Sequence, residues 1–198
     1  QREFNLLAAP GYPELISNLE TLNADRKDTA FVLGDTPFRL APTSTEITNY
    51  ANNTAGAADN GEDGLVTTDS FTGVYYPPGL TTDLNGESVA VPSSHMMMRT
   101  IAFNDQVAFP WFAPAGIRRG AIDNASSVGF INGEGEFETT AVSEGLRDAL
   151  YSVHINPISF VTGAGLVAFG QKTRQLTPSA LDRINVARLV AFTRLQLD

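Results

Sequence analysis

The chain contains no cysteine and little charge for its length. Without cysteine, disulfide bonds and thiolate metal sites are excluded. Charged residues make up 18% of the 198 residues, below the fraction of about a quarter that is usual for proteins. The sequence also lacks a secretory signal and any apolar run near the roughly 18 residues that a membrane-spanning helix needs. We therefore expect no membrane insertion, and a surface that neighbouring molecules partly cover.

Positive charge is scarce and unevenly placed. The chain has 13 Lys and Arg against 22 Asp and Glu, for a net charge of −9. Nucleic acid is not an expected partner, because phosphate binding requires clustered cations. Residues 1–100 carry 5 basic and 13 acidic side chains, whereas residues 147–197 carry 6 basic and 2 acidic ones. An acidic N-terminal half and a basic C-terminal segment are compatible with head-to-tail contacts between identical copies. They are equally compatible with two solvated faces.

Hydrophobic periodicity predicts alternating strands and helices. A buried strand at 4–9, a helix at 14–23 and a strand at 29–33 form the pattern of a parallel βαβ unit. The remaining expected strands are at 71–76, 89–91 and 166–169, and the remaining helices are at 45–51, 93–106, 140–153 and 177–195. Ser93 or Ser94 is the expected cap of the helix at 93–106. The pattern predicts an α/β fold in which helices flank a sheet.

The sequence offers no convincing catalytic group. His95 lies beside Ser93 and Ser94, but neighbours at one helix start do not form a triad, and no G-x-S-x-G nucleophile elbow is present. His154 follows a helix end, where a histidine complements the helix dipole. We therefore expect no catalytic residue and no enzyme activity.

Two segments partly match ligand-binding motifs, but neither has all the features that its motif requires. The acidic segment 59–64 lacks a side-chain ligand at Gly61 and an acid at Ser70, so it does not match an EF-hand loop. Gly163-Ala-Gly165 with Gly170 leads into a strand rather than a helix, unlike a dinucleotide-binding loop. No metal and no cofactor are expected.

Four segments of the second half form a series of recognisable motifs. They are Trp111-Phe-Ala-Pro-Ala-Gly116 with Arg119-Gly120, Leu150-Tyr151 followed by Ile155-Asn-Pro-Ile158, Phe169-Gly-Gln-Lys-Thr173, and Asp182-Arg-Ile-Asn-Val186 with Arg188-Leu189. In this order they resemble elements of the contractile tail sheath family. One position departs from the family pattern: Ala187 stands where many members carry arginine.

The resemblance implies a fold and a domain division. Residues 1–120 would form the family's α/β domain, which is called subtilisin-like for its fold. Residues 121–198 would begin a C-terminal α+β sheath domain. Because the chain starts at Gln1 rather than Met, we expect a fragment of a longer protein, such as a protease-resistant piece. A fragment of this kind is expected to be monomeric or weakly associating.

The resemblance also implies a function and partners. The protein would be a structural subunit of a virion tail, assembled in the host cytoplasm, that polymerises around an inner tube and contracts to drive the tube through the host envelope. Its partners would be other copies of itself, the tube protein, and the baseplate and tail terminator proteins. The alternatives are the sheath of a phage-derived injection device, a hydrolase with a subtilisin-like fold, and a generic α/β binding module.

Six residues are candidates for subunit or tube contacts. In the family, the segment that carries Arg183, Arg188 and Arg194 lies toward the inner tube, so these arginines are expected to meet an acidic tube surface or solvent. Trp111, with Phe109 and Phe112, is a candidate for the core first and for an interface anchor second. Arg118 and Arg119 are expected to fix the aromatic loop by bonding nearby carbonyls.

Overall fold

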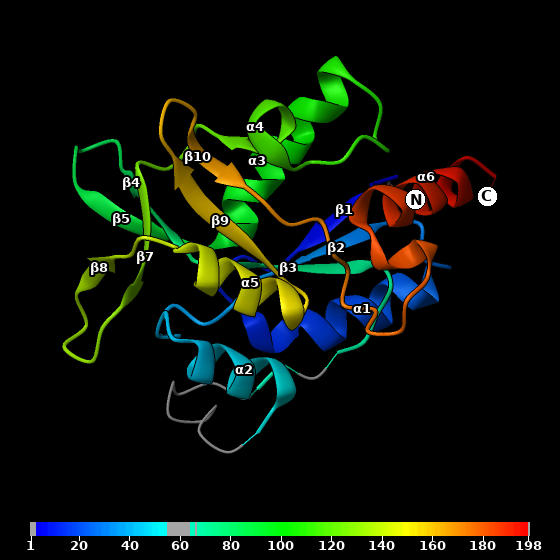
Figure 1. Cartoon of the computed structure of the whole chain (residues 1–198). Helices are drawn as coiled ribbons and strands as arrows, with labels where there is room; N and C mark the ends of the chain where they lie inside the picture. The colour runs from blue at the N-terminus through cyan, green and yellow to red at the C-terminus, as the bar shows by residue number, and fades with distance from the viewer. Residues whose placement is uncertain (1–2, 55–63, 66, 198) are drawn as a thin grey trace.

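A computed structural model describes residues 3–54, 64–65 and 67–197. Strands and helices are interspersed along the chain, and helices flank the larger of two sheets (Figure 1). This is the α/β architecture that the sequence predicts. The acidic segment 59–64 lies, except for Gly64, outside the described residues.

The main sheet has six strands in the order β1-β2-β3-β9-β10-β6. The strands are β1 (Leu6–Ala8), β2 (Phe31–Gly34), β3 (Thr72–Tyr76), β9 (Ile155–Val161), β10 (Gly165–Ala168) and β6 (Ala121–Ile122). The first four run parallel, whereas β10 runs antiparallel to both β9 and β6. Every residue of β2 and β3 is buried, as expected of parallel strands covered on both faces. The strand expected to be buried at the N-terminus, β1, is only partly buried because it lies at the sheet edge.

Helices cover both faces of the main sheet. In Figure 1, α1 (Ile16–Asp25), α2 (Ser44–Asn52) and α5 (Glu144–Ser152) lie on one side, and α3 (Ser93–Val107) and α6 (Ile184–Leu197) lie on the other. The surroundings of two glycines in the central strands also show that the two faces of the sheet are covered by different helices. A Cβ at Gly34 would meet Ile16 of α1, whereas a Cβ at Gly73 would meet Ile184 of α6. Because α1 links β1 to the parallel strand β2, the predicted βαβ unit is confirmed.

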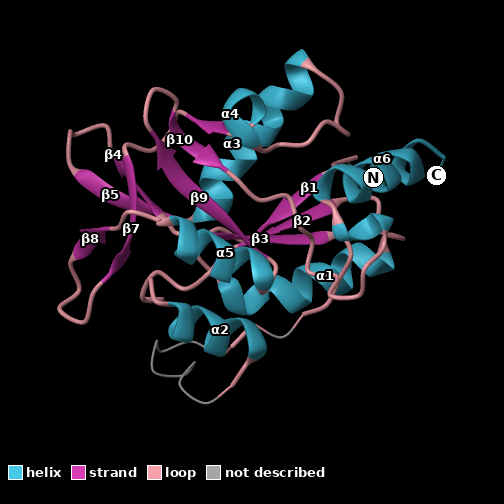
Figure 2. Cartoon of the chain, viewed as in Figure 1, coloured by secondary structure: helices cyan, strands magenta, loops and turns pink. Residues whose placement is uncertain are grey.

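A second sheet of four strands projects from the main sheet (Figure 2). Its order is β5-β4-β7-β8, and all its pairs are antiparallel. The strands are β4 (Gly79–Thr82), β5 (Ser88–Val91), β7 (Ser127–Ile131) and β8 (Phe137–Thr139). We call residues 79–91 and 127–139 the small sheet. Of its strands the sequence predicted only β5.

Two helices begin later than the periodicity predicts, and local hydrogen bonds explain both. The helix expected at 140 begins at Glu144, because the hydroxyl of Ser143 accepts from the Leu146 amide and caps it there. The helix expected at 177 begins at Ile184. Ser179 instead caps a separate 3-10 turn at Ala180–Asp182, and Arg183 is extended. Two further short helices are the 3-10 turn Pro13–Leu15 and α4 (Gly116–Arg119).

Strand β9 is the longest element that the sequence analysis missed. Its Asn156-Pro157 pair belongs to one of the four motifs but was not assigned to a strand, whereas Pro157 lies opposite Tyr76 in the parallel pairing of β9 with β3. Gly163 and Gly165 lie at the turn between β9 and β10, with φ of 83° and 79°. A left-handed backbone conformation therefore accounts for these two glycines.

One buried hydrophobic cluster takes residues from both halves of the chain, including Phe31 and Ile101 as well as Leu150 and Ile184. Strands β6, β9 and β10 likewise join β1–β3 in the main sheet. The division at residue 120 stays a prediction about the domains of a longer protein.

Candidate assembly surface

A buried carboxylate fixes the start of α3 against the end of β2. Asp35 is 2% exposed, and its Oδ1 accepts from the Ser94 amide at 2.6 Å and from the Ser93 hydroxyl at 2.9 Å. Its Oδ2 accepts from the Ser94 hydroxyl at 2.7 Å and from the Gly11 amide at 2.9 Å. The expectation that Ser93 or Ser94 caps the helix is wrong, because Pro92 is the N-cap residue and makes no side-chain cap. A carboxylate from another strand complements the positive helix end instead.

This cluster is not arranged as a catalytic triad. Burial raises the pKa of the Asp35 carboxyl above its usual value, and the hydrogen bonds from Gly11, Ser94 and Ser93 counteract part of that rise. His95 is exposed, and within the described residues no hydrogen bond joins a histidine ring to Asp35 or to either serine. The cluster positions α3.

The loop after α3 carries a stack of aromatic rings at the surface. Phe109 and Trp111 stack with centroids 4.7 Å apart and planes 7° apart, and Phe112 lies 5.9 Å from Phe109. The ring of Trp111 also packs against that of Phe192 of α6, with the two centroids 5.9 Å apart. Trp111 is partly exposed and lies outside the buried core, so the expectation of a core role for it is wrong. The rings join the loop to α6, and Phe109 remains 56% exposed.

Arg119 contacts this loop through a ring rather than a carbonyl. Its guanidinium lies 3.8 Å from the centroid of Phe112, a cation–π contact. Its backbone carbonyl accepts from Asn104 Nδ2 at 2.6 Å, which ties α4 to α3. In the part of the chain that the structure describes, neither Arg118 nor Arg119 donates a side-chain hydrogen bond to a carbonyl, contrary to the expectation.

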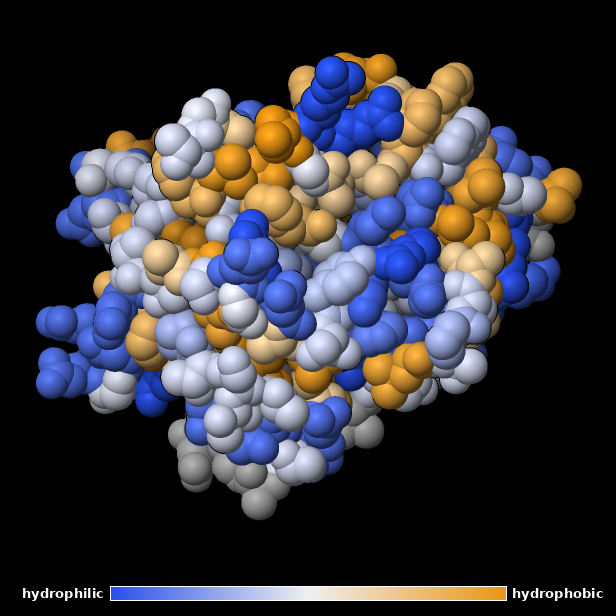
Figure 3. Space-filling model, in the orientation of Figure 1, coloured by the Kyte–Doolittle hydropathy of each residue, from blue (hydrophilic) through white to orange (hydrophobic). Residues whose placement is uncertain are grey.

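A small depression lies beside the aromatic loop, between α3, α4 and β6. Its volume is about 130 Å³, and its lining includes Arg99, Phe103, Arg118 and Arg119. Arg99 is held by Asp123, with Nε 2.7 Å from Oδ1. Around it, apolar side chains are exposed on α3 and α4: Phe103, Val107 and Ile117 are 62%, 65% and 62% exposed. In Figure 3, strongly hydrophilic and strongly hydrophobic residues lie next to one another over this end of the molecule.

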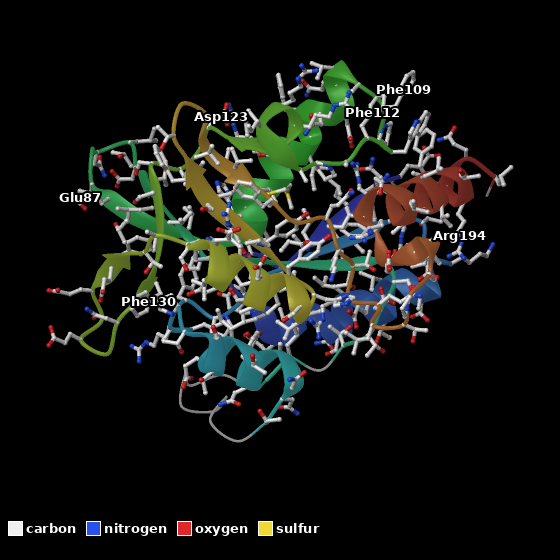
Figure 4. The ribbon with its side chains drawn as sticks, in the orientation of Figure 1. Glu87, Phe109, Phe112, Asp123, Phe130 and Arg194 are labelled. Atoms are coloured by element: carbon white, nitrogen blue, oxygen red, sulfur yellow. The ribbon has the colours of Figure 1, made fainter. Side chains whose placement is uncertain are left out.

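The arginines of the last segment differ in accessibility. Arg188 is 3% exposed, and its Nη2 lies 2.6 Å from Asp105 Oδ2 of α3. Arg183 donates to the Tyr151 hydroxyl at 2.5 Å and pairs with Asp182. Arg194 pairs with Asp28 at 2.8 Å, with 42% of its side chain exposed (Figure 4). Of these three arginines, Arg183 and Arg194 therefore present a guanidinium at the surface, and Arg188 does not.

Two motifs singled out in the sequence meet at a buried polar junction. Asn156 is fully buried; its Nδ2 donates to the carbonyls of Val74 and Lys172, and its Oδ1 accepts from the Lys172 amide at 2.7 Å. Arg174, 2% exposed, donates to the carbonyls of Val153 and Ala51. Asn156, with Lys172 of the second motif and the adjacent Arg174, holds β3, β9 and the segment after β10 together. Sequence reasoning missed their role, for which the signal was an asparagine inside an apolar run.

Two kinds of feature are absent from the described residues. No group of three or more His, Cys, Asp or Glu among them could hold a metal ion. None of the helices they form has the length and apolar character needed to cross a membrane.

The chain is similar in sequence to two curated proteins. No protein-family profile matches it. The tail sheath proteins of Vibrio phage KVP40 and of Enterobacteria phage T4 are each 37% identical to it over 99 residues, which is 50% of this chain. The match spans only 13% and 14% of those two relatives.

The fold is shared with solved contractile sheaths. The sheath complex of an extracellular contractile injection system, PVC, in the contracted state has a TM-score of 0.71 at 21% identity, over 100% of this chain and 47% of that one. The helical sheath of the anti-feeding prophage in the contracted state has a TM-score of 0.65 at 21% identity, over 98% and 45%. The resemblance to contractile sheath proteins that the four motifs indicate is confirmed, and the fold is that of a sheath protein.

Proposed function

We propose that this chain, whose sequence relatives are tail sheath proteins, is part of a structural subunit of a contractile sheath. The subunit polymerises around an inner tube and contracts to drive the tube through a host envelope. The observation that carries this proposal is the 37% identity to two phage tail sheath proteins. A sheath fold that accounts for the whole chain supports it.

The protein acts by assembly rather than by catalysis. Its relatives are sheath proteins, and the buried cluster of hydroxyl and carboxylate groups at Asp35, Ser93 and Ser94 is occupied in capping a helix. A hydrolase would need a histidine poised between these groups. The hydrolase alternative is therefore not favoured.

The protein is assembled in the host cytoplasm and is located in the virion tail. Its partners are other copies of itself, the tube protein, and the baseplate and tail terminator proteins. A phage-derived injection device is the second candidate. It is favoured by one observation, the likeness in fold to the PVC and anti-feeding prophage sheaths. The work done by the subunit is the same in both devices.

Two arginines are the best candidates for contact with the tube. Arg183 and Arg194 expose guanidinium groups on the last segment, whereas Arg188 is enclosed by its pair with Asp105. Reversing both exposed charges, as R183E with R194E, should leave contacts between sheath copies intact and weaken binding to the tube. Tube binding at the unmodified level in a co-sedimentation assay would refute this contact.

Electron microscopy of the whole subunit of which this chain is part, expressed alone, tests the proposed function. Hollow cylinders or stacked rings are the expected result. If only dispersed particles form at every concentration and ionic strength tested, and preformed tubes do not recruit the protein, the sheath role is refuted.

A further inference from the structure

The depression between α3 and α4 has a cation that lacks a partner. None of the ion pairs formed by the described residues involves Arg118, which is exposed on α4. Arg119 lines the same hollow, as do Arg99 and Asp123, which pair with each other, so the lining keeps a positive balance. Phe103 and Ile117 beside it are each 62% exposed. A basic hollow with an apolar border is suited to an acidic segment that also carries apolar side chains.

The size of the hollow restricts what can fill it. Its volume of about 130 Å³ is well below the 300–1,000 Å³ of typical small-molecule pockets. One acidic side chain fits this volume better than a cofactor does. The occupant is therefore expected to be a protein segment that inserts a single carboxylate.

The small sheet offers a segment of this kind. It contains Asp83, Glu87, Glu134, Glu136 and Glu138 and no Lys or Arg, so it accounts for five of the nine net negative charges. The three glutamates of the β7–β8 hairpin are exposed, and none of them is in an ion pair of the described residues. Phe137, partly exposed, lies between two of them. At the hairpin base, the Ile131 amide donates to the carbonyl of Phe38, the neighbour of Arg39 in the sequence.

The two surfaces lie too far apart to meet within one molecule. In Figure 1, α4 lies at one end of the molecule and the turn between β7 and β8 at another. Figure 4 shows the same separation between Asp123, beside the hollow, and Phe130 of β7. A contact between them must join two copies, and because it joins different patches it can repeat along an open array.

We propose that the β7–β8 hairpin of one copy binds the basic hollow between α3 and α4 of a second copy, with a hairpin glutamate paired to Arg118. This inference rests on the proposed sheath function and identifies one contact between its copies. The charge complementarity, the unpaired Arg118 and the apolar border of the hollow all favour a second copy as the occupant.

Charge exchange tests the contact directly. Self-association of the protein is measured by analytical ultracentrifugation at low ionic strength. The hairpin variant E134K/E136K/E138K and the hollow variant R118E should each raise the dissociation constant about tenfold or more, because like charges then face each other. An equimolar mixture of the two variants should recover heterologous dimers, because opposite charges meet again at one interface. All four side chains are exposed, so these substitutions should leave the fold intact.

A control and a second measurement keep the outcomes distinct. Glu14→Lys changes an exposed charge outside both surfaces and should leave the dissociation constant unchanged. If the two variants associate no better when mixed than apart, or if neither variant weakens association, the contact is wrong. Electron microscopy distinguishes failure of this contact from failure of the sheath role. If the unmodified protein forms cylinders although the charge variants show no effect, the sheath role stands and this contact does not. Recovered dimers, without cylinders and without recruitment to preformed tubes, would keep the contact and refute the sheath role.

Discussion

The main sheet and the small sheet use the same backbone hydrogen bonding but bury very different shares of their side chains. β2 and β3 are buried at every residue, whereas neither β5 nor β8 has a buried residue. Polar groups beside the main sheet, such as Asn156 and Arg188, are bonded inside the chain. The charged groups of the small sheet are carboxylates that face solvent.

This difference separates the two tasks of the chain. Side chains packed on the main sheet determine whether the chain folds, since a buried polar group that loses its partner is costly. Side chains on the small sheet are mostly exposed, so we expect their substitution to leave the fold almost unaffected and, under our proposal, to change the contact with a second copy. Matched substitutions at buried and exposed sites test this division, because they compare the loss of folding stability in the two regions.

The largest effect is expected at the buried ion pair between α6 and α3. Arg188→Met should lower the free energy of unfolding by about 3 kcal/mol, because it leaves the Asp105 carboxylate without a partner in a poorly solvated place. The matched change Arg99→Met breaks a pair whose side chains are 60% and 69% exposed, so it should cost less than about 1 kcal/mol. Urea denaturation measures both. Equal losses would contradict the separation.

The next effect is expected at two asparagines. Asn156→Ala should cost about 2–3 kcal/mol, because it leaves the Val74 carbonyl and both backbone groups of Lys172 without their partner. Asn132, in the β7–β8 turn, also bonds backbone amides, those of Glu134 and Glu136. Asn132→Ala should cost about 1 kcal/mol or less, because water replaces the lost bonds. If Asn132→Ala proves the more costly change, the small sheet carries stability that we assign to the main sheet.

Two glycines give a smaller contrast. A Cβ at Gly170 would lie 2.5 Å from Asn156 Oδ1 and 2.8 Å from Asn156 Cα, whereas one at Gly133 would meet nothing within 4 Å. Gly170→Ala should therefore destabilise the protein by about 1–3 kcal/mol, and Gly133→Ala should stay within about 0.5 kcal/mol of the unmodified protein. Thermal unfolding of the two variants side by side checks this. An unaffected Gly170→Ala protein would mean that the Asn156 junction can shift.

The smallest effect concerns pH. Burial lowers the pKa of His154 below its usual 6.5, and the charges of Lys172 and Arg174 act in the same direction. Folding therefore disfavours protonation of the ring, so the stability it contributes is present above pH 6.5 and is lost as the pH falls through the lowered pKa.

His154→Asn isolates this effect. Asparagine tolerates the left-handed backbone at this position, where φ is 60°, and it does not titrate. The variant should lose less stability than the unmodified protein between pH 7.5 and pH 5, as measured by urea denaturation at each pH. An identical loss in both proteins would exclude a role for His154.

Much of the main sheet could be predicted from the sequence, because parallel strands and their helices leave periodic signals. Apolar runs marked β2 and β3, and helical spacing marked α1 and α3. The small sheet was mostly missed, because strands exposed on both faces, such as β8, lack a strong apolar alternation. Strand β9 was missed because a proline in its interior resembles a boundary signal.

The candidate site was predicted in part. The motifs drew attention to Trp111, Arg118 and Arg119, and the structure places all three on or beside one surface. Which arginines are accessible could not be predicted, because enclosure of Arg188 depends on Asp105, 83 residues away.

Cryo-electron microscopy of the protein mixed with purified inner tubes of a contractile tail tests the central claim most directly. The account predicts a regular helical layer around the tube, built from copies in which α6 faces inward. Bare tubes beside dispersed protein, under conditions where the protein is folded, would contradict it.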